Sequence, residues 1–237
     1  MMSILKKLLV GKVTKKELSK HNPIQKRIQN LKSIWNNDHQ EDSGIEKIVR
    51  LLLSSSQLLF PGIYIKYCAD KIGREYQDLA MDIYILLKVI FPFLIIYNQW
   101  QNNSILISIM VYVLLETVLY IPTLIFASDL FTQPRSYKRS MLLLFFNYAE
   151  IVVSFAVLYT IGNNMNQPFK HWFDPIYFSL ISANSIGFGD YYPITTFGKV
   201  LASLQGMFFL SFVVLFLNFF STKVKTKGYF DDESSNE

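Results

Sequence analysis

Four long apolar stretches dominate this chain of 237 residues and restrict what it can fold into. They cover residues 83–100, 105–127, 141–161 and 200–220. An α-helix of about 20 apolar residues is long enough to cross the hydrocarbon core of a bilayer. Such a helix also satisfies its backbone hydrogen bonds internally, as the lipid environment requires. The sequence therefore predicts an all-α membrane protein with four transmembrane helices.

A fifth apolar stretch, residues 51–65, is shorter and less uniform than the other four. It contains three consecutive serines and is interrupted by Pro61 and Gly62. Both residue types are unfavourable inside a helix. We therefore expect a juxtamembrane or interfacial segment here rather than a fifth span.

Basic residues are concentrated at the start of the chain. The first 80 residues contain 14 Lys and Arg against 8 Asp and Glu, whereas the remainder contains 9 and 10. Basic residues also occur between the second and third stretches and after the fourth, but the connection 162–196 has only Lys170. Cytoplasmic loops are enriched in Lys and Arg. The pattern predicts a multi-pass protein of the plasma membrane with both termini cytoplasmic and residues 162–196 outside.

The composition argues against several other classes of protein. Cys68 is the only cysteine and the three histidines are scattered, so neither an intramolecular disulfide nor a zinc site is expected. The sequence shows neither a nucleophile–base pair nor a cluster of metal ligands that would indicate an enzyme. We therefore expect neither catalytic activity nor a cofactor. We attribute the formal net charge of +5 to the flanks of the spans rather than to nucleic-acid binding.

The predicted outer connection contains a second apolar run, residues 175–183, which is too short to cross the membrane. Asp174 suits an N-cap and Pro175 suits the first helical position, so a short helix is expected to begin here. The sequence Ser-Ile-Gly-Phe-Gly-Asp follows at residues 185–190. Glycines at alternate positions permit backbone conformations that other residues resist. The pattern predicts a re-entrant loop, whose backbone must be buried in protein or line a water-filled path.

Residues 185–190 resemble the signature of the potassium-channel family, whose commonest form is Thr-Val-Gly-Tyr-Gly-Asp. The similarity continues into residues 193–199 and covers residues 139–220 as outer helix, pore helix, filter and inner helix. In that family, backbone carbonyls from four copies of the loop replace the hydration shell of the ion. The resemblance therefore implies a homotetrameric, potassium-selective pore. A nonselective cation channel of the same architecture and a non-conducting scaffold or regulatory subunit remain as alternatives.

The resemblance also assigns roles to individual residues. K+ would be the only bound metal ion, held in a selectivity filter made of Ser185, Ile186, Gly187, Phe188 and Gly189. The Ser185 hydroxyl would supply the innermost ring of ligands. The pore helix would end near Asn184 and direct its partial negative charge towards the central cavity. Asp190 would need a partner behind the filter, for which Tyr177 is the candidate.

Three positions of this region depart from the usual pattern of the family. Ser185 stands in place of Thr and lacks a methyl group, and Phe188 stands in place of Tyr and lacks a hydroxyl group. Ile181 occupies a position where some bacterial relatives have a carboxylate. The first two departures would loosen the filter and favour inactivation.

The fourth apolar stretch should line the cytoplasmic half of the pore. Helical spacing places Leu210, Val213 and Leu217 on one face, which by resemblance faces the cavity and the gate. A stripe that faces lipid is the alternative, because this helix is apolar all round. Gly206 could be a hinge or a site of close packing.

Three ionisable residues lie within the predicted spans: Lys88, Glu116 and Glu150. Such residues are rare in a membrane and usually functional. A pair between Lys88 and one of the glutamates would neutralise an expensive charge. Such a pair could fix the packing of the spans, or two carboxylates sharing one site could sense protons.

These features divide the chain into four parts. Residues 1–80 form a basic cytosolic or juxtamembrane segment, and residues 81–138 form two peripheral transmembrane helices. Residues 139–221 form the pore domain, and residues 222–237 form a short cytosolic tail. Apolar residues at helical spacing over 45–52 suit an interfacial helix, and the N-terminal lysines would attract anionic lipids. A solvated N-terminal tail remains an alternative, and an unidentified soluble or membrane regulator is a further expected partner.

Overall fold

The computed structural model describes residues 22–38, 43–73, 76–127 and 137–223. Within these ranges the fold is all-α, and no strand is formed. Eight helices are described: α2 (Pro23–Asn36), α3 (Gly44–Ser56), α4 (Pro61–Ile72), α5 (Gln77–Tyr97), α6 (Ser104–Phe126), α7 (Tyr137–Thr160), α8 (Asp174–Ala183) and α9 (Thr196–Lys223).

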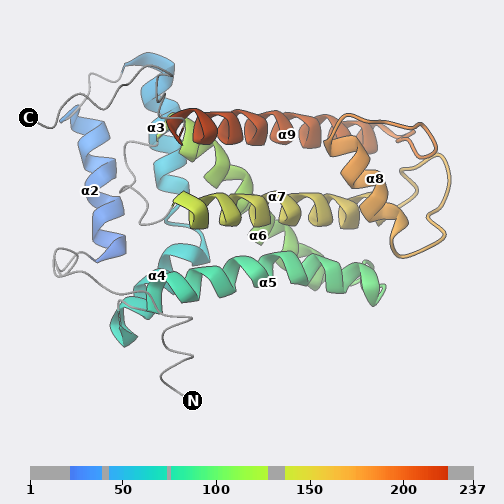
Figure 1. Cartoon of the computed structure of the whole chain (residues 1–237), viewed down its shortest axis with the longest axis horizontal. Helices are drawn as coiled ribbons and strands as arrows, with labels where there is room; N and C mark the ends of the chain where they lie inside the picture. The colour runs from blue at the N-terminus through green and yellow to red at the C-terminus, as the bar shows by residue number, and fades with distance from the viewer. Residues whose placement is uncertain (1–21, 39–42, 74–75, 128–136, 224–237) are drawn as a thin grey trace, which may run out of the picture.

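Four of these helices, α5, α6, α7 and α9, are long and apolar enough to cross a membrane. They match the four predicted stretches, and the prediction of an all-α membrane protein is confirmed. Figure 1 shows α5, α7 and α9 running along a common direction, with α8 at one end of the bundle and α2 at the other. α6 begins where the Asn103 side chain accepts hydrogen bonds from two backbone N–H groups of the first turn, as an N-cap does.

The core of the bundle is built around α7. One cluster of buried side chains joins α7 to α6, α8 and α9 through residues such as Ile121, Phe155 and Phe212. A second cluster joins α7 to α5, α6 and α8 through Ile95 and Val157. Because α7 belongs to both clusters, it connects the peripheral spans to the α8–α9 region.

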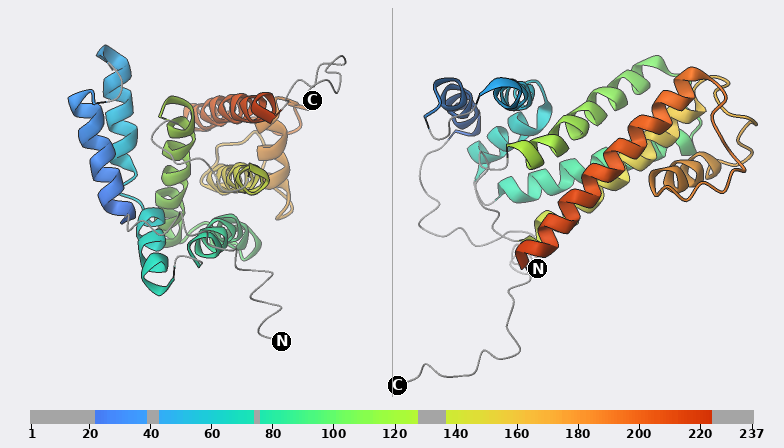
Figure 2. Two further views of the ribbon diagram at one scale, coloured as in Figure 1. Left: turned by 60° about the vertical axis from the view of Figure 1, so that its left-hand side comes forward. Right: turned by 90° about the horizontal axis from the view of Figure 1, so that it is seen from above.

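The two N-terminal helices α2 and α3 pack against each other beside α6. In both views of Figure 2, α6 separates them from α7 and α9. Lys47 of α3 links the pair, because its Nζ donates to the Trp35 carbonyl at 2.8 Å and to Asn37 Oδ1 at 3.0 Å. Both acceptors lie at the C-terminal end of α2, where unpaired carbonyls need donors.

Helices α3 and α4 are bent by 53° at a short break before Pro61. The bend contacts α6: Tyr112 donates from its hydroxyl to the Leu59 carbonyl at 2.6 Å, and the Gly62 N–H donates to Glu116 Oε1 at 3.1 Å. At 1.5 Å per residue, Tyr112 and Glu116 lie about 12 and 18 Å along α6 from its start. The bend therefore lies beside the middle of α6.

Candidate functional site: the pore loop

The connection between α7 and α9 contains α8 and then residues 185–190, which we call the glycine loop. α8 begins at Asp174, where the sequence predicted a helix to start, but its N-cap is Phe173 and Asp174 lies in its first turn. The Asp174 carboxylate instead accepts hydrogen bonds from the Lys170 N–H, the His171 N–H and the Tyr191 hydroxyl, at 2.8, 2.9 and 3.0 Å. Partial desolvation raises the pKa of Asp174, but these hydrogen bonds outweigh it and hold the pKa below its ordinary value. Asp174 therefore fastens the segments before and after α8 to each other.

A buried hydrogen-bond network holds the middle of α8 against α7 and α9. Gln205 of α9 donates from Nε2 to the Ser179 carbonyl at 3.0 Å and to Ser179 Oγ at 2.6 Å. Its Oε1 accepts from the Tyr159 hydroxyl of α7 at 2.8 Å, and Ser179 Oγ donates to the Val152 carbonyl at 2.6 Å. Sequence analysis did not single out these residues, although a Gln within an otherwise apolar span was a usable signal.

The end of α8 is held by a separate contact. Asn184 caps the helix, and its Oδ1 accepts a hydrogen bond from the Tyr148 hydroxyl of α7 at 3.0 Å. The Tyr148 ring packs edge-on against Phe212 of α9 with centroids 5.3 Å apart. The predicted position of Asn184 at the end of the short helix is therefore found, and Tyr148 adds a support that the sequence did not reveal.

The glycine loop has an unusual backbone. Positive φ angles occur at Ser185 (57°), Gly187 (55°) and Gly189 (83°), and Ile186 and Phe188 between them have negative φ. No atom of the described chain lies within 4 Å of where a Cβ would stand at either glycine. Residues 185–190 are all exposed within one chain.

Apolar side chains of the glycine loop are exposed within one chain. Ile186 is 54% exposed and Phe188 is 70% exposed. Large apolar side chains at membrane depth usually pack against protein or lipid. Contacts within one chain therefore leave both side chains largely uncovered.

Asp190 lies where the glycine loop returns to the outer connection. Its backbone carbonyl accepts hydrogen bonds from Asn166 Nδ2 at 3.1 Å and from Gln167 Nε2 at 3.0 Å. Tyr177 of α8 lies near the Asp190 carboxylate: desolvation raises the pKa of the phenol, and its interaction with the negatively charged Asp190 raises this pKa further. The structure thus brings together Tyr177 and Asp190, the pair that the resemblance suggested. The amides of residues 166 and 167 carried no recognisable signal in the sequence.

The chain leaves the loop through a tight turn into α9. Ile194 donates from its N–H to the Asn164 carbonyl at 2.9 Å, and Thr195 Oγ1 donates to Asn164 Oδ1 at 2.5 Å. A Cβ at Gly198 would lie 2.9 Å from Pro193 Cβ and 3.2 Å from the Asn164 carbonyl oxygen. The backbones approach closely here, which explains the need for glycine at position 198.

Two of the three predicted gate residues are exposed on α9. Leu210 and Leu217 are each 64% exposed, whereas Val213 is half-buried and Val214 is 51% exposed. α9 continues without a break through Gly206, and a Cβ there would meet no atom of the described chain within 4 Å. Contacts within the chain therefore give no support to Gly206 as a site of close packing.

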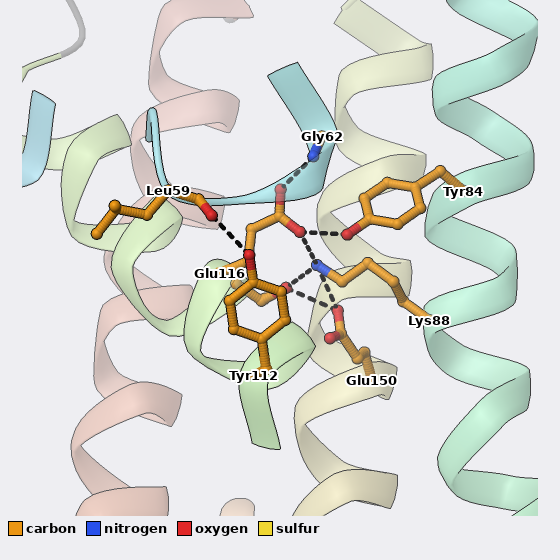
Figure 3. Close-up of polar contacts among 8 residues, drawn as sticks. Leu59, Gly62, Tyr84, Lys88, Tyr112, Glu116 and Glu150 are labelled. Carbon is orange, nitrogen blue, oxygen red and sulfur yellow. Dashed lines mark hydrogen bonds and ion pairs between the residues drawn. The ribbon is translucent and has the colours of Figure 1, made fainter. Parts of the chain in front are cut away.

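The three intramembrane charges are brought together, away from the glycine loop. Lys88 of α5 lies between Glu116 of α6 and Glu150 of α7, as Figure 3 shows. The sequence predicted a pair between Lys88 and one of these glutamates, and the structure places Lys88 against both.

Comparison with protein-family models matches residues 141–226 to a family described as "ion channel". The matched region contains most of α7, all of α8, the glycine loop and α9. Comparisons with curated proteins and with solved structures found no significant match. The family match and the loop between α7 and α9 agree in one respect: residues 141–226 are similar to the domain of pore-loop ion channels.

Proposed function

We propose that this chain is one subunit of a homotetrameric, potassium-selective channel of the plasma membrane. The observation that carries the proposal is the backbone of the glycine loop. Its φ angles alternate in sign, and residues 185–190 are exposed within one chain. Rings of backbone carbonyls of this kind replace the hydration shell of K+ in potassium channels. The proposed ligands are the carbonyls of residues 185–189 together with the Ser185 hydroxyl.

The proposal of four copies is supported by what a single chain leaves uncovered. Each chain supplies one loop, and a ring of carbonyls needs several. Exposed apolar residues also form a stripe along α9 at helical spacing: Phe197, Val200, Leu204, Met207, Leu210, Val214 and Leu217. This stripe would face the cavity and the neighbouring α9 helices in the assembly. The α8 C-terminus would point its partial negative charge into the same cavity.

A nonselective cation channel of the same architecture is the alternative. It is favoured by the two departures from the usual filter sequence, Ser185 and Phe188. Phe188 has no hydroxyl with which to tie the filter to its surroundings, and its side chain is largely exposed in one chain. A non-conducting scaffold is less favoured, because both glycines and Asp190 are present with the backbone geometry described above.

The proposed orientation places both termini in the cytoplasm and the α7–α9 connection outside. It follows from the excess of Lys and Arg in the N-terminal segment and after α9. Basic side chains of α2 and α4, among them Lys26, Lys32 and Lys71, would then lie on the side of the anionic leaflet and attract its headgroups. No catalytic activity is proposed.

Potassium selectivity is tested by measuring the reversal potential of the purified protein in a planar bilayer, with K+ on one side and Na+ on the other. A value near the potassium equilibrium potential supports the proposal, and a value near zero favours the nonselective alternative.

Two matched variants test the role of the glycine loop, Gly187→Ala and Gly44→Ala. Both glycines have positive φ and open space around the Cβ position, but only Gly187 lies in the loop. We expect Gly187→Ala to abolish the current and Gly44→Ala to preserve it. Native mass spectrometry of the same protein tests the tetramer.

A further inference from the structure

A buried ionic cluster lies between three spans at a distance from the pore loop. Lys88 Nζ of α5 is 3.2 Å from Glu150 Oε2 of α7 and 3.7 Å from Glu116 Oε2 of α6. The side chains of Lys88, Glu150 and Glu116 are 5%, 1% and 16% exposed. Figure 3 shows the two carboxylates on opposite sides of the ammonium group.

The two carboxylates differ in how completely they are bound. Glu116 accepts from the Gly62 N–H of α4 through Oε1 and from the Tyr84 hydroxyl of α5 through Oε2, in addition to its ion pair with Lys88. Glu150 uses only Oε2, which accepts from Thr117 Oγ1 at 2.7 Å and pairs with Lys88. Glu150 Oε1 is buried and has no hydrogen-bond partner among the described residues. An unpaired buried carboxylate oxygen is costly and requires an explanation.

The charges of the cluster do not balance. One lysine faces two glutamates, so the cluster carries one net negative charge when both carboxylates are ionised. The phenols of Tyr84, Tyr112 and Tyr120 also lie nearby, but a phenol cannot supply a positive charge. Arg27 of α2 faces Tyr120 rather than the carboxylates. No cation among the described residues other than Lys88 is therefore in contact with them.

We propose that this cluster is a buried proton-binding site, with the proton carried by Oε1 of Glu150. The bound proton makes the cluster neutral, and on Oε1 it displaces no donor because that oxygen accepts no hydrogen bond. Glu116, whose two oxygens both accept hydrogen bonds, then keeps all of its donors. An uncompensated charge in a low-dielectric interior is strongly unfavourable, which gives the proton its binding energy.

The same cluster connects the N-terminal helices to the pore-loop region. Glu116 holds the first turn of α4 through Gly62, and Lys88 links Glu116 to Glu150 of α7. Two residues before Glu150, Tyr148 donates to Asn184 at the base of the glycine loop. Loss of the proton leaves a negative charge that water entry or separation of the helices would relieve. Proton occupancy therefore sets how closely the α3–α4 bend is held to α6 and α7.

The test uses Cys68, the single native cysteine, which is exposed on α4. The full-length protein carrying a nitroxide spin label on Cys68 is reconstituted in lipid vesicles. Its spectrum is then recorded between pH 5 and pH 9. We expect the mobility of the label to change with a single midpoint. Glu150→Gln, which resembles the protonated side chain in shape and charge, should hold the low-pH spectrum throughout. Glu46→Gln, at an exposed position of α3, should titrate like the unmodified protein.

Several outcomes would overturn the proposal. One is a constant spectrum in the unmodified protein, and another is a Glu150→Gln variant that titrates normally. A midpoint that moves with Na+ concentration at constant ionic strength would assign the site to a metal cation instead. If Glu150→Gln does not fold, infrared spectroscopy of the unmodified protein must still show the carbonyl band of a protonated carboxyl group disappear as the pH rises. None of these measurements requires a current, so failure of the proton site and failure of the proposed channel activity are distinguishable.

Discussion

Gly62 and Glu116 approach each other so closely that any side chain at position 62 would displace the Glu116 carboxylate. The Gly62 N–H donates to Glu116 Oε1 at 3.1 Å, and a Cβ at position 62 would lie 2.5 Å from the same oxygen. Gly62 lies in the first turn of α4, where backbone N–H groups have no partner within the helix. The contact therefore determines how closely the α3–α4 bend approaches α6.

The first prediction is that Gly62→Ala destabilises the protein although alanine is the better helix former. The new methyl group displaces the Glu116 carboxylate, and a hydrogen bond to a charged group contributes about 1.5–3 kcal/mol. We expect a lower unfolding temperature of the detergent-solubilised protein, measured by differential scanning fluorimetry. Gly206→Ala is the control, because a Cβ there meets no atom of the described chain. Equal shifts for the two variants would contradict the prediction.

The second prediction concerns the buried amide of Gln205, which bonds to both α7 and α8. Gln205→Leu fills a similar volume but removes the partners of Tyr159 and Ser179. Each buried polar group left unsatisfied costs about 1–3 kcal/mol, so we expect a loss of at least about 2 kcal/mol in the free energy of unfolding. The measurement is chemical unfolding of the assembled protein.

The control for this variant is Ser203→Ala. Ser203 is exposed on α9 and its hydroxyl donates to the Lys199 carbonyl of the same helix. Surface substitutions of this kind usually change stability by less than about 0.5 kcal/mol. A Gln205→Leu protein as stable as the Ser203→Ala protein would mean that the network does not hold α8 in place.

The spans and the pore loop were predictable because local sequence determines them. About 20 apolar residues in a row have few alternatives to a membrane helix, and α6 (Ser104–Phe126) begins one residue before the predicted stretch and ends one residue before its end. The prediction was less accurate for α5, which begins at Gln77 rather than at residue 83. A membrane helix is able to continue past its apolar part, and the apolar pattern does not mark that extension.

Contacts between distant segments were not predictable in the same way. Nothing local indicates that Gln205 meets Ser179, or that the amide of Asn166 reaches the Asp190 carbonyl. The position of the α3–α4 bend depends on Gly62 finding Glu116, 54 residues further along the chain. The pairing of Lys88 was partly predictable, because a charge within a span requires a partner. That both glutamates take part depends on the packing of three helices.

The third prediction concerns Tyr177, which faces Asp190 behind the glycine loop. Tyr177→Phe removes the hydroxyl and retains the ring, so the Asp190 carboxylate loses a donor and the return of the loop is held less firmly. We expect a lower open probability and faster loss of current in single-channel recordings. Tyr192→Phe is the control, since that side chain is 53% exposed on the same segment. An unchanged open probability in Tyr177→Phe would exclude this role for the hydroxyl.

The fourth prediction concerns the pH dependence of the segment before α8. The hydrogen bonds from Lys170, His171 and Tyr191 hold the pKa of Asp174 below its ordinary value in the folded protein. A carboxyl group with a lowered pKa stabilises the fold above its ordinary pKa of about 4. That contribution is lost as the pH falls through the lower pKa of the folded state.

Hydrogen exchange of the Lys170 and His171 amides measures this effect, because both amides donate to Asp174. We expect their protection, relative to an Asp174→Asn variant, to be greatest at neutral pH and to fall in the acid range below pH about 4. The Ile194 amide donates to the Asn164 carbonyl instead, and its relative protection should not change over the same range. If the relative protection of all three amides falls together, acid loosens the whole outer connection. Titration of Asp174 alone would then not be the cause, because the Ile194 bond contains no ionisable group.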